Sequence, residues 1–405
     1  MNYINISENE KIVLDEKYIA RAKQILLYEP DLPFSICENS IVFDSYIIGS
    51  LKIDDLIINI NSRNKAFTLS KAFEMMLYNS KIKSNISSTF DVTTSSGLSV
   101  LPSLFIQSCT RLVKNGLTGG YENINEYSKE AKGNIDFSTF QKSLVALNGL
   151  KVSYDNYSLN VLQNSIIKSA LIKCELFVQQ SEIFKIEELL KSFGSVDEVV
   201  DCDFEESEIL NFFSSNSNYK ETLRLSLMIL KDLKLKINKG DIEWCSFLTN
   251  SNDLFEAFAR NIIKNNINEK VEKWDAPKEF ASITHETNVG YKSFVPDILI
   301  NYSPSTNTAS AVVDAKNKSF DPKATNPAEL VSSGDLYQLL FYLRQLKTKI
   351  GALIYPCDQD YAPIKVSVND NNDYRIFLLS INISKSIVEM ENKIKKDIYE
   401  VLLKI

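Results

Sequence analysis

The stretch FVPDILINYSPSTNTASAVVDAKN, residues 294–317, holds the pattern that decides the fold. Two apolar runs, VPDILI and ASAVVDAK, flank the polar segment SPSTNT, which is typical of two strands joined by a turn. Each run carries one aspartate, and sixteen residues separate Asp297 from Asp314. The pattern therefore predicts an antiparallel pair of strands that brings Asp297 beside Asp314.

Asp314, Ala315 and Lys316 close the second run. Side chains two apart on a strand face the same side, so Asp314 and Lys316 should project together while Ala315 faces the packed layer. Two neighbouring buried carboxylates are costly unless a cation neutralises them. Mg²⁺ does so while keeping waters for a substrate phosphate, and Lys316 could then orient a bound water and stabilise phosphate charge. The alternative is an ordinary hairpin with edge carboxylates, because Asp-x-Lys is a common tripeptide.

Helical periodicity appears on both sides of this hairpin. LFEAFARNIIKNN (254–266) predicts an amphipathic helix with Glu256 at its polar edge, within reach of a metal. Gln338 and Tyr342 are four residues apart in LYQLLFYL and share one helical face, where Gln338 could bond to the lysine or to a DNA phosphate. The remaining elements are expected at THETNVG (284–290, strand), GALIYP (351–356, a buried strand stopped by Pro356) and 384–403 (helix).

Upstream, residues 34–60 alternate apolar and polar side chains around turn residues, which predicts a small β-rich module. Residues 70–117 and 159–235 have helical periods, and the glycine-containing segment GLTGGYENINEYSKEAKGNID (116–136) between them is interpreted as a loop. We divide the chain into a β-rich domain (1–95), a mainly helical middle domain (96–240) and an α/β domain (241–405) whose mixed central sheet is flanked by helices.

Composition excludes several classes of site. The chain has 405 residues, a net charge of −7 and a single histidine, His285, which argues against catalytic triads and multi-histidine metal sites. Its six cysteines are scattered without a CxxC motif, as expected for a cytoplasmic protein. We expect no membrane span and no secretory signal. Neither half is strongly basic, so DNA contacts would need a local patch or a partner.

Glu256, Pro296-Asp297, Asp314-Ala315-Lys316 and Gln338-x-x-x-Tyr342 together resemble the PD-(D/E)XK nuclease superfamily, in the expected order. Within that superfamily, the chain resembles McrC, the nuclease subunit of McrBC modification-dependent restriction systems. The resemblance covers about residues 70–405. It is most specific in KWDA (273–276), VVDAK (312–316) and LYQLLFYLRQLK (336–347) followed by GALIYP, and it extends to SNDLFEAF (251–258), QNSIIKSAL (163–171) and AKGNIDF (131–137).

The resemblance implies a restriction-endonuclease-like fold and a Mg²⁺-dependent DNA endonuclease, with Mn²⁺ as a substitute metal. Glu256, Asp297 and Asp314 would bind the metal together with the carbonyl of Ala315. Lys316 would be the catalytic lysine, and Gln338 and Tyr342 would support the site and the DNA backbone.

The resemblance also implies partners: a ring of McrB-like AAA+ GTPases, whose hydrolysis the chain would stimulate, and double-stranded, modified DNA. A GxxxxGK[ST] phosphate loop is missing from the sequence, which agrees with nucleotide hydrolysis by a partner. We expect residues 1–95 to dock the motor. The family has arginines where this chain has Lys132, Asn134 and Ser165.

Two other functions remain open. A nuclease-like fold could act only as a non-catalytic activator of a motor ATPase or GTPase. A stand-alone RecB-like exonuclease would carry the same motif and would degrade DNA ends without a partner.

Overall fold

The computed structural model describes residues 2–403 except positions 66, 83–96, 140–148, 179, 200–216, 239–240, 286–287, 319, 324 and 370–372. The chain divides into two compact units, residues 1–92 with 248–405, and residues 93–247. The range 1–95 is therefore grouped mainly with the C-terminal range, and its role in docking a motor stays a prediction. Within the described ranges, no helix is long and apolar enough to cross a membrane.

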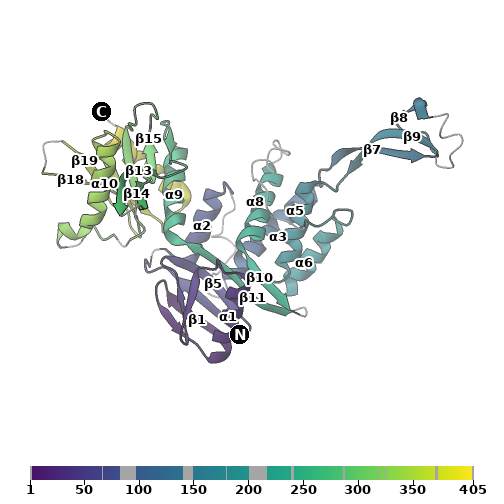
Figure 1. Cartoon of the computed structure of the whole chain (residues 1–405), viewed down its shortest axis with the longest axis horizontal. Helices are drawn as coiled ribbons and strands as arrows, with labels where there is room; N and C mark the ends of the chain where they lie inside the picture. Colours follow the sequence, from purple (N-terminus) through teal and green to yellow (C-terminus); the bar gives the residue numbers. More distant parts are fainter. Residues whose placement is uncertain are drawn as a thin grey trace. The chain divides into compact units, whose positions relative to one another are not determined.

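The N-terminal part of the first unit is β-rich, as predicted for residues 34–60 (Figure 1). β5 and β6 pair antiparallel, β1 pairs parallel with β6, and β2, β4 and β3 form a second antiparallel sheet. The elements here are β1 (Asn2–Ser7), β2 (Lys11–Val13), α1 (Glu16–Tyr28), β3 (Phe34–Cys37), β4 (Ser40–Phe43), β5 (Ile47–Ile53), β6 (Leu56–Asn61) and α2 (Leu69–Asn79).

The C-terminal part contains a six-stranded mixed sheet in the order β12-β15-β16-β17-β19-β18. β15 and β16 are antiparallel, as the sequence predicted, while β16, β17 and β19 run parallel. The elements are α9 (Ser251–Asn266), β12 (Val271–Glu272), β13 (Lys278–His285), β14 (Asn288–Phe294), β15 (Ile298–Ile300), β16 (Ala311–Ala315), η3 (Pro327–Leu330), α10 (Ser333–Gln345), β17 (Ile350–Cys357), β18 (Ile364–Val366), β19 (Arg375–Asn382), α11 (Ile387–Ile398) and η4 (Tyr399–Leu403).

Helices cover both faces of this sheet, which confirms the predicted mixed sheet flanked by helices. Alternate side chains of β16 divide between the two faces. Val313 packs with Phe258 of α9 and Ile394 of α11, whereas Val312 packs with Leu339 of α10. Asp314 lies two positions after Val312 on β16, so the two side chains face the same side of the sheet. Asp314 therefore points toward α10.

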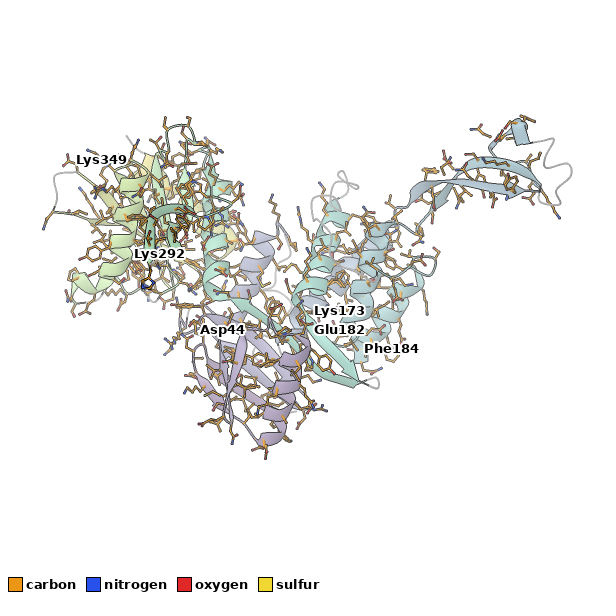
Figure 2. The ribbon with its side chains drawn as sticks, viewed as in Figure 1. Asp44, Lys173, Glu182, Phe184, Lys292 and Lys349 are labelled. Carbon is orange, nitrogen blue, oxygen red and sulfur yellow. The ribbon has the colours of Figure 1, made fainter. Side chains whose placement is uncertain are left out.

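The second unit is mainly helical, as predicted for its central part. α8 packs against α3 and α5, and Lys173 of α5, labelled in Figure 2, donates a hydrogen bond to the carbonyl of Leu230 in α8 at 2.9 Å. Five apolar side chains of α5 are fully buried: Ile166, Ile167, Ala170, Leu171 and Cys174. The elements are α3 (Gly97–Asn115), β7 (Gly120–Ser128), β8 (Asn134–Ile135), η2 (Phe137–Thr139), β9 (Leu150–Ser158), α5 (Leu162–Cys174), α6 (Gln180–Lys191), α8 (Ser217–Asp232), β10 (Lys234–Asn238) and β11 (Asp241–Asn250), which continues into the first unit.

The interpretation of residues 116–136 as a loop was wrong. β7 and β9 pair along nine residues each and form a ribbon that extends from the helices of this unit (Figure 1). Most residues of β7 are exposed and only Val152 of the two strands is fully buried, so the sequence lacks the alternation that marks a half-buried strand. Gly133 has a φ of +53°, and a Cβ there would lie 2.3 Å from the carbonyl oxygen of Ser153, so only glycine fits.

Two strand predictions also need correction. THETNVG was predicted as one strand, but its first two residues belong to β13 and its last three to β14, and these two strands pair antiparallel. Residues 286–287 between them lie outside the described residues. Pro356 does not stop β17, because the strand continues to Cys357 and stays paired with β19. Pro356 instead lies beyond the last residue that pairs with β16, which is Ile354.

Candidate active site

The two aspartates lie side by side at the end of the central hairpin. Asp297 directly precedes β15, and it stands one position beyond the paired residues Ile298 and Val313, opposite Asp314. Directly opposed residues of an antiparallel pair have Cα atoms about 4.5–5.5 Å apart. Asp297 Oδ2 also accepts a hydrogen bond from the backbone N–H of Ala315 at 2.8 Å. The predicted proximity of Asp297 and Asp314 is thus present.

Both carboxyl groups are destabilised as anions. Burial, then the charge of Asp314 and then that of Glu256, raise the pKa of Asp297 to about 8. Burial also raises the pKa of Asp314, whose side chain is only 1% exposed, although the neighbouring Lys316 ammonium acts in the opposite direction. Two such groups are stabilised in ionised form by a cation placed between them.

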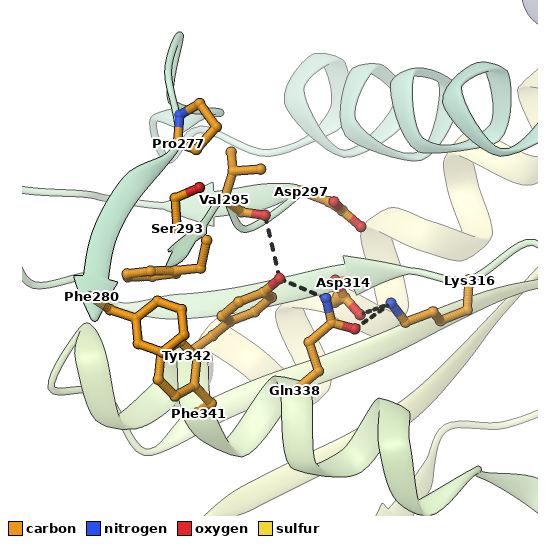
Figure 3. A pocket seen from close by; sticks show the side chains of 11 residues that line it. Pro277, Phe280, Ser293, Val295, Asp297, Asp314, Lys316, Gln338, Phe341 and Tyr342 are labelled. Atoms are coloured by element: carbon orange, nitrogen blue, oxygen red, sulfur yellow. Dashed lines mark hydrogen bonds and ion pairs between the residues drawn. The ribbon is translucent and has the colours of Figure 1, made fainter. Parts of the chain in front are cut away.

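Lys316 supplies one positive charge at this point. Its Nζ lies 2.6 Å from Asp314 Oδ2 and donates a hydrogen bond to Gln338 Oε1 at 3.0 Å (Figure 3). Burial is the largest single influence and lowers the pKa of Lys316, but the charge and hydrogen bond of Asp314, together with the charges of Asp297 and Asp335, raise it above the usual value. Lys316 therefore stays protonated at neutral pH.

Gln338 and Tyr342 come from α10 and join the same network. Gln338 Nε2 donates to Tyr342 Oη at 2.7 Å, and Tyr342 Oη donates to the carbonyl oxygen of Val295 at 3.4 Å. Burial raises the pKa of Tyr342 to about 12, with the charges of Asp314 and Asp297 adding to the effect, so the hydroxyl stays neutral. The helical spacing of four residues thus places both side chains at the site.

Glu256 lies close to this group but faces other partners. Its Oε1 accepts hydrogen bonds from Arg260 Nη1 at 2.8 Å and from Lys273 Nζ at 2.5 Å. Arg260 Nη1 also donates to the carbonyl oxygen of Asp297 at 3.4 Å. The sequence prediction did not include these two cations, although Lys273 stands in the KWDA segment.

A pocket of about 550 Å³ opens above Asp297 and Asp314. One side carries the charged network and the other is aromatic. Phe280 on the aromatic side was missed, because the sequence assigned no strand to residues 278–283. The lining residues are Pro277, Phe280, Ser293, Phe294, Val295, Asp297, Asp314, Lys316, Gln338, Phe341 and Tyr342.

The fit of a divalent cation rests on the two aspartates. Asp314 Oδ2 is buried and lies 2.6 Å from Lys316 Nζ, and a carboxylate has further acceptor positions beyond this ion pair that could bind a metal. Among the residues that the structure describes, no three His, Cys, Asp or Glu side chains are arranged to hold a metal ion. Glu256, expected as the third carboxylate, is instead neutralised by Arg260 and Lys273.

A family model described as McrBC 5-methylcytosine restriction system component matches residues 43–356. The chain belongs to this McrBC family. The match includes Glu256, Asp297, Asp314, Lys316 and both residues of the QxxxY pair.

One solved structure shows the same fold. The chain is similar to one in a refined half-complex from a tetradecameric assembly of Thermococcus gammatolerans McrB AAA+ hexamers with bound McrC. The identity is 16% and the TM-score 0.66, over 99% of this chain and 100% of that one. A second match, to a chain of the Thermococcus gammatolerans McrBC complex, has 17% identity and a TM-score of 0.47, over 65% of this chain and 88% of that one. No curated protein sequence matches the chain. The McrC-like fold predicted from the sequence is therefore confirmed.

Proposed function

We propose that this chain is the DNA-cleaving subunit of a modification-dependent restriction complex and hydrolyses phosphodiester bonds in the Asp297–Asp314–Lys316 pocket with a PD-(D/E)XK site. The observation that carries the proposal is the buried ion pair between Lys316 and Asp314 at 2.6 Å, beside a second carboxyl group whose pKa is raised to about 8. Strongly perturbed titratable groups in a pocket are typical of functional sites. Membership of the McrBC family supports the same reaction.

Mg²⁺, or Mn²⁺ as a substitute, would be held by Asp297, Asp314 and the carbonyl of Ala315. Glu256 would become a further ligand when its ion pairs with Arg260 and Lys273 break. The metal would supply a Lewis acid and lower the pKa of a bound water. Within the chain, the protonated Lys316 would stabilise the negative charge that grows on the phosphate oxygens. Gln338 holds the ammonium group in place, and Tyr342 in turn holds Gln338.

The proposed partner is a ring of McrB-like AAA+ GTPases, and the proposed substrate is double-stranded, modified DNA. The similar solved chain comes from an assembly of McrB AAA+ hexamers with bound McrC, and it is covered over its whole length. A net charge of −7 leaves little basic surface for independent DNA binding, which agrees with a partner that delivers the DNA.

The test is cleavage of methylated duplex DNA by the chain, its partner ring, GTP and Mg²⁺. Asp314→Asn should reduce the rate by about a thousandfold, because an amide is a poor metal ligand and no longer pairs with Lys316. Asp253→Asn, at an exposed position in the first turn of α9, is the control and should cleave at the wild-type rate. If Asp314→Asn cleaved DNA at the wild-type rate, this pocket would not be the active site.

The non-catalytic activator is the second candidate, and one observation favours it. Glu256 is bound by Arg260 and Lys273 rather than facing the two aspartates. A pure activator would stimulate GTP hydrolysis by the partner and leave DNA intact, with the wild-type chain and with Asp314→Asn alike. Measurement of both reactions in one assay separates the two functions.

A further inference from the structure

An aromatic cluster forms the wall of the pocket that faces the charged groups. Phe280 and Phe341 have ring centroids 4.8 Å apart, and Phe294 lies 5.2 Å from Phe341 and 5.8 Å from Tyr342. Figure 3 shows Phe280 and Phe341 on one side of the pocket and Lys316 on the other. A ligand in this pocket would therefore meet charged groups and phenyl rings at the same time.

Phe280 is placed by an irregularity in the strand. β13 and β14 pair in register from Ala281 to His285, but the register shifts between Glu279 and Ala281, so Phe280 stands outside the regular pairing. A β-bulge of this kind re-aims a side chain and is frequent beside active sites. The bulge turns Phe280 toward Phe341 and the pocket.

The ring of Phe280 is also partly open to solvent. Its side chain remains 47% exposed although it contacts two other rings. Exposed apolar surface beside a pocket marks a binding site more often than it stabilises a fold. Every nucleobase has a flat π-face, and base–aromatic stacking is tolerant of sequence.

We infer that Phe280, backed by Phe341, is a stacking platform for the nucleobase next to the scissile phosphate. This inference rests on the proposed function, because the phosphate is assigned to Asp297, Asp314 and Lys316. With the phosphate at Lys316, the attached nucleoside would extend across the pocket toward the aromatic wall. The subsite would take a base that has left the duplex stack, without selecting which base.

The probe is a short single-stranded oligonucleotide that contains 2-aminopurine, whose fluorescence falls when the base stacks on an aromatic ring. The full-length chain is titrated with this probe in Ca²⁺, which occupies carboxylate sites. Phe280→Ala should weaken binding by about tenfold and remove the quenching, while Phe280→Trp should retain both. Tyr291→Ala is the matched control, because Tyr291 lies on the same hairpin and is 59% exposed but does not line the pocket.

Equal quenching by the wild type and Phe280→Ala, or no quenching by the wild type, would overturn the inference. It would also be overturned if Phe280→Ala changed only the self-association of the chain in sedimentation velocity, since the wall would then be a contact between copies. Asp314→Asn separates the two claims. It should lose cleavage and still quench the probe, so that failure of the catalytic proposal and failure of the stacking platform give different results.

Discussion

The pocket of the first unit and the β7–β9 ribbon of the second differ in how they treat polar side chains. In the pocket, Asp314 is 1% exposed and depends on Lys316 for compensation. In the ribbon, polar side chains stand in water, and pairs such as Asn123 with Asp155, at 2.9 Å, are exposed. Burial strengthens electrostatic interactions and exposure screens them. The same residue types can therefore carry chemistry in one region and contribute little in the other.

The largest expected effect is on catalysis. Lys316→Met should reduce DNA cleavage by about a hundredfold to a thousandfold, because it removes the partly buried positive charge that would face the phosphate. Lys318→Met is the control. Lys318 is 49% exposed and pairs with Asp335, so its rate should stay near that of the wild type in the same gel assay. If Lys316→Met and Lys318→Met lost the same share of the cleavage rate, Lys316 would have no special role in the reaction.

The second effect is on stability and its dependence on pH. A carboxyl group whose pKa is raised in the folded state stabilises the fold below its unfolded pKa, and this contribution is lost as the pH rises through the folded pKa. For Asp297 the window runs from about pH 4 to about pH 8. Metal-free wild type should thus lose melting temperature between pH 5 and pH 8, and Asp297→Asn should lose less. Parallel curves from calorimetry in EDTA would contradict the raised pKa.

A smaller effect is expected on metal affinity. Lys273→Gln removes one of the two cations on Glu256, so the carboxylate becomes freer to bind a divalent ion, and Ca²⁺ or Mn²⁺ should bind a few times more tightly. Lys270→Gln is the control, since Lys270 pairs with Glu272 at an exposed position. Isothermal titration measures both. Weaker binding by Lys273→Gln would mean that Lys273 holds Glu256 in its ligand position.

The smallest expected effect is on the free energy of unfolding after a substitution in the β7–β9 ribbon. Tyr127→Ser replaces a side chain that is 57% exposed, and it should change the free energy of unfolding by less than about 0.5 kcal/mol. Val152→Ala, at a position of the same ribbon that is 1% exposed, should cost more than about 1 kcal/mol. Urea denaturation gives both values. A large loss in Tyr127→Ser would show that the exposed face of the ribbon is packed in solution.

Elements that bury one face were predictable from the sequence, and elements without a buried face were not. The strands around Asp297 and Asp314 and the helices that carry Glu256 and Gln338 all have an apolar face, and their predictions were confirmed. β7 of the ribbon and β13 of the hairpin are exposed on most residues, so no hydrophobic period marks them. Both were misassigned for this reason.

The residues of the candidate site were likewise predictable where they lie on elements that have a buried face. Five predicted residues meet in one pocket, because strand and helix periods fix the direction of their side chains: Asp297, Asp314, Lys316, Gln338 and Tyr342. Of the two partners of Glu256, Arg260 stands four residues along the same helix, a spacing that indicates contact. Lys273 could not be predicted, since it lies seventeen positions away in an irregular segment. Metal binding by these residues stays a prediction.

Pro356 has a consequence for the floor of the pocket. The backbone N–H of Lys316 donates to the carbonyl of Ile354, and in a parallel ladder the next bond would run from residue 356 to the carbonyl of Lys316. Proline has no N–H, so that rung cannot form. Because this hydrogen bond is missing, the pairing of β16 with β17 cannot extend further. The backbone at Lys316 is thereby left to diverge from the sheet, and its carbonyl instead accepts a hydrogen bond from the backbone N–H of Lys318 at 2.9 Å.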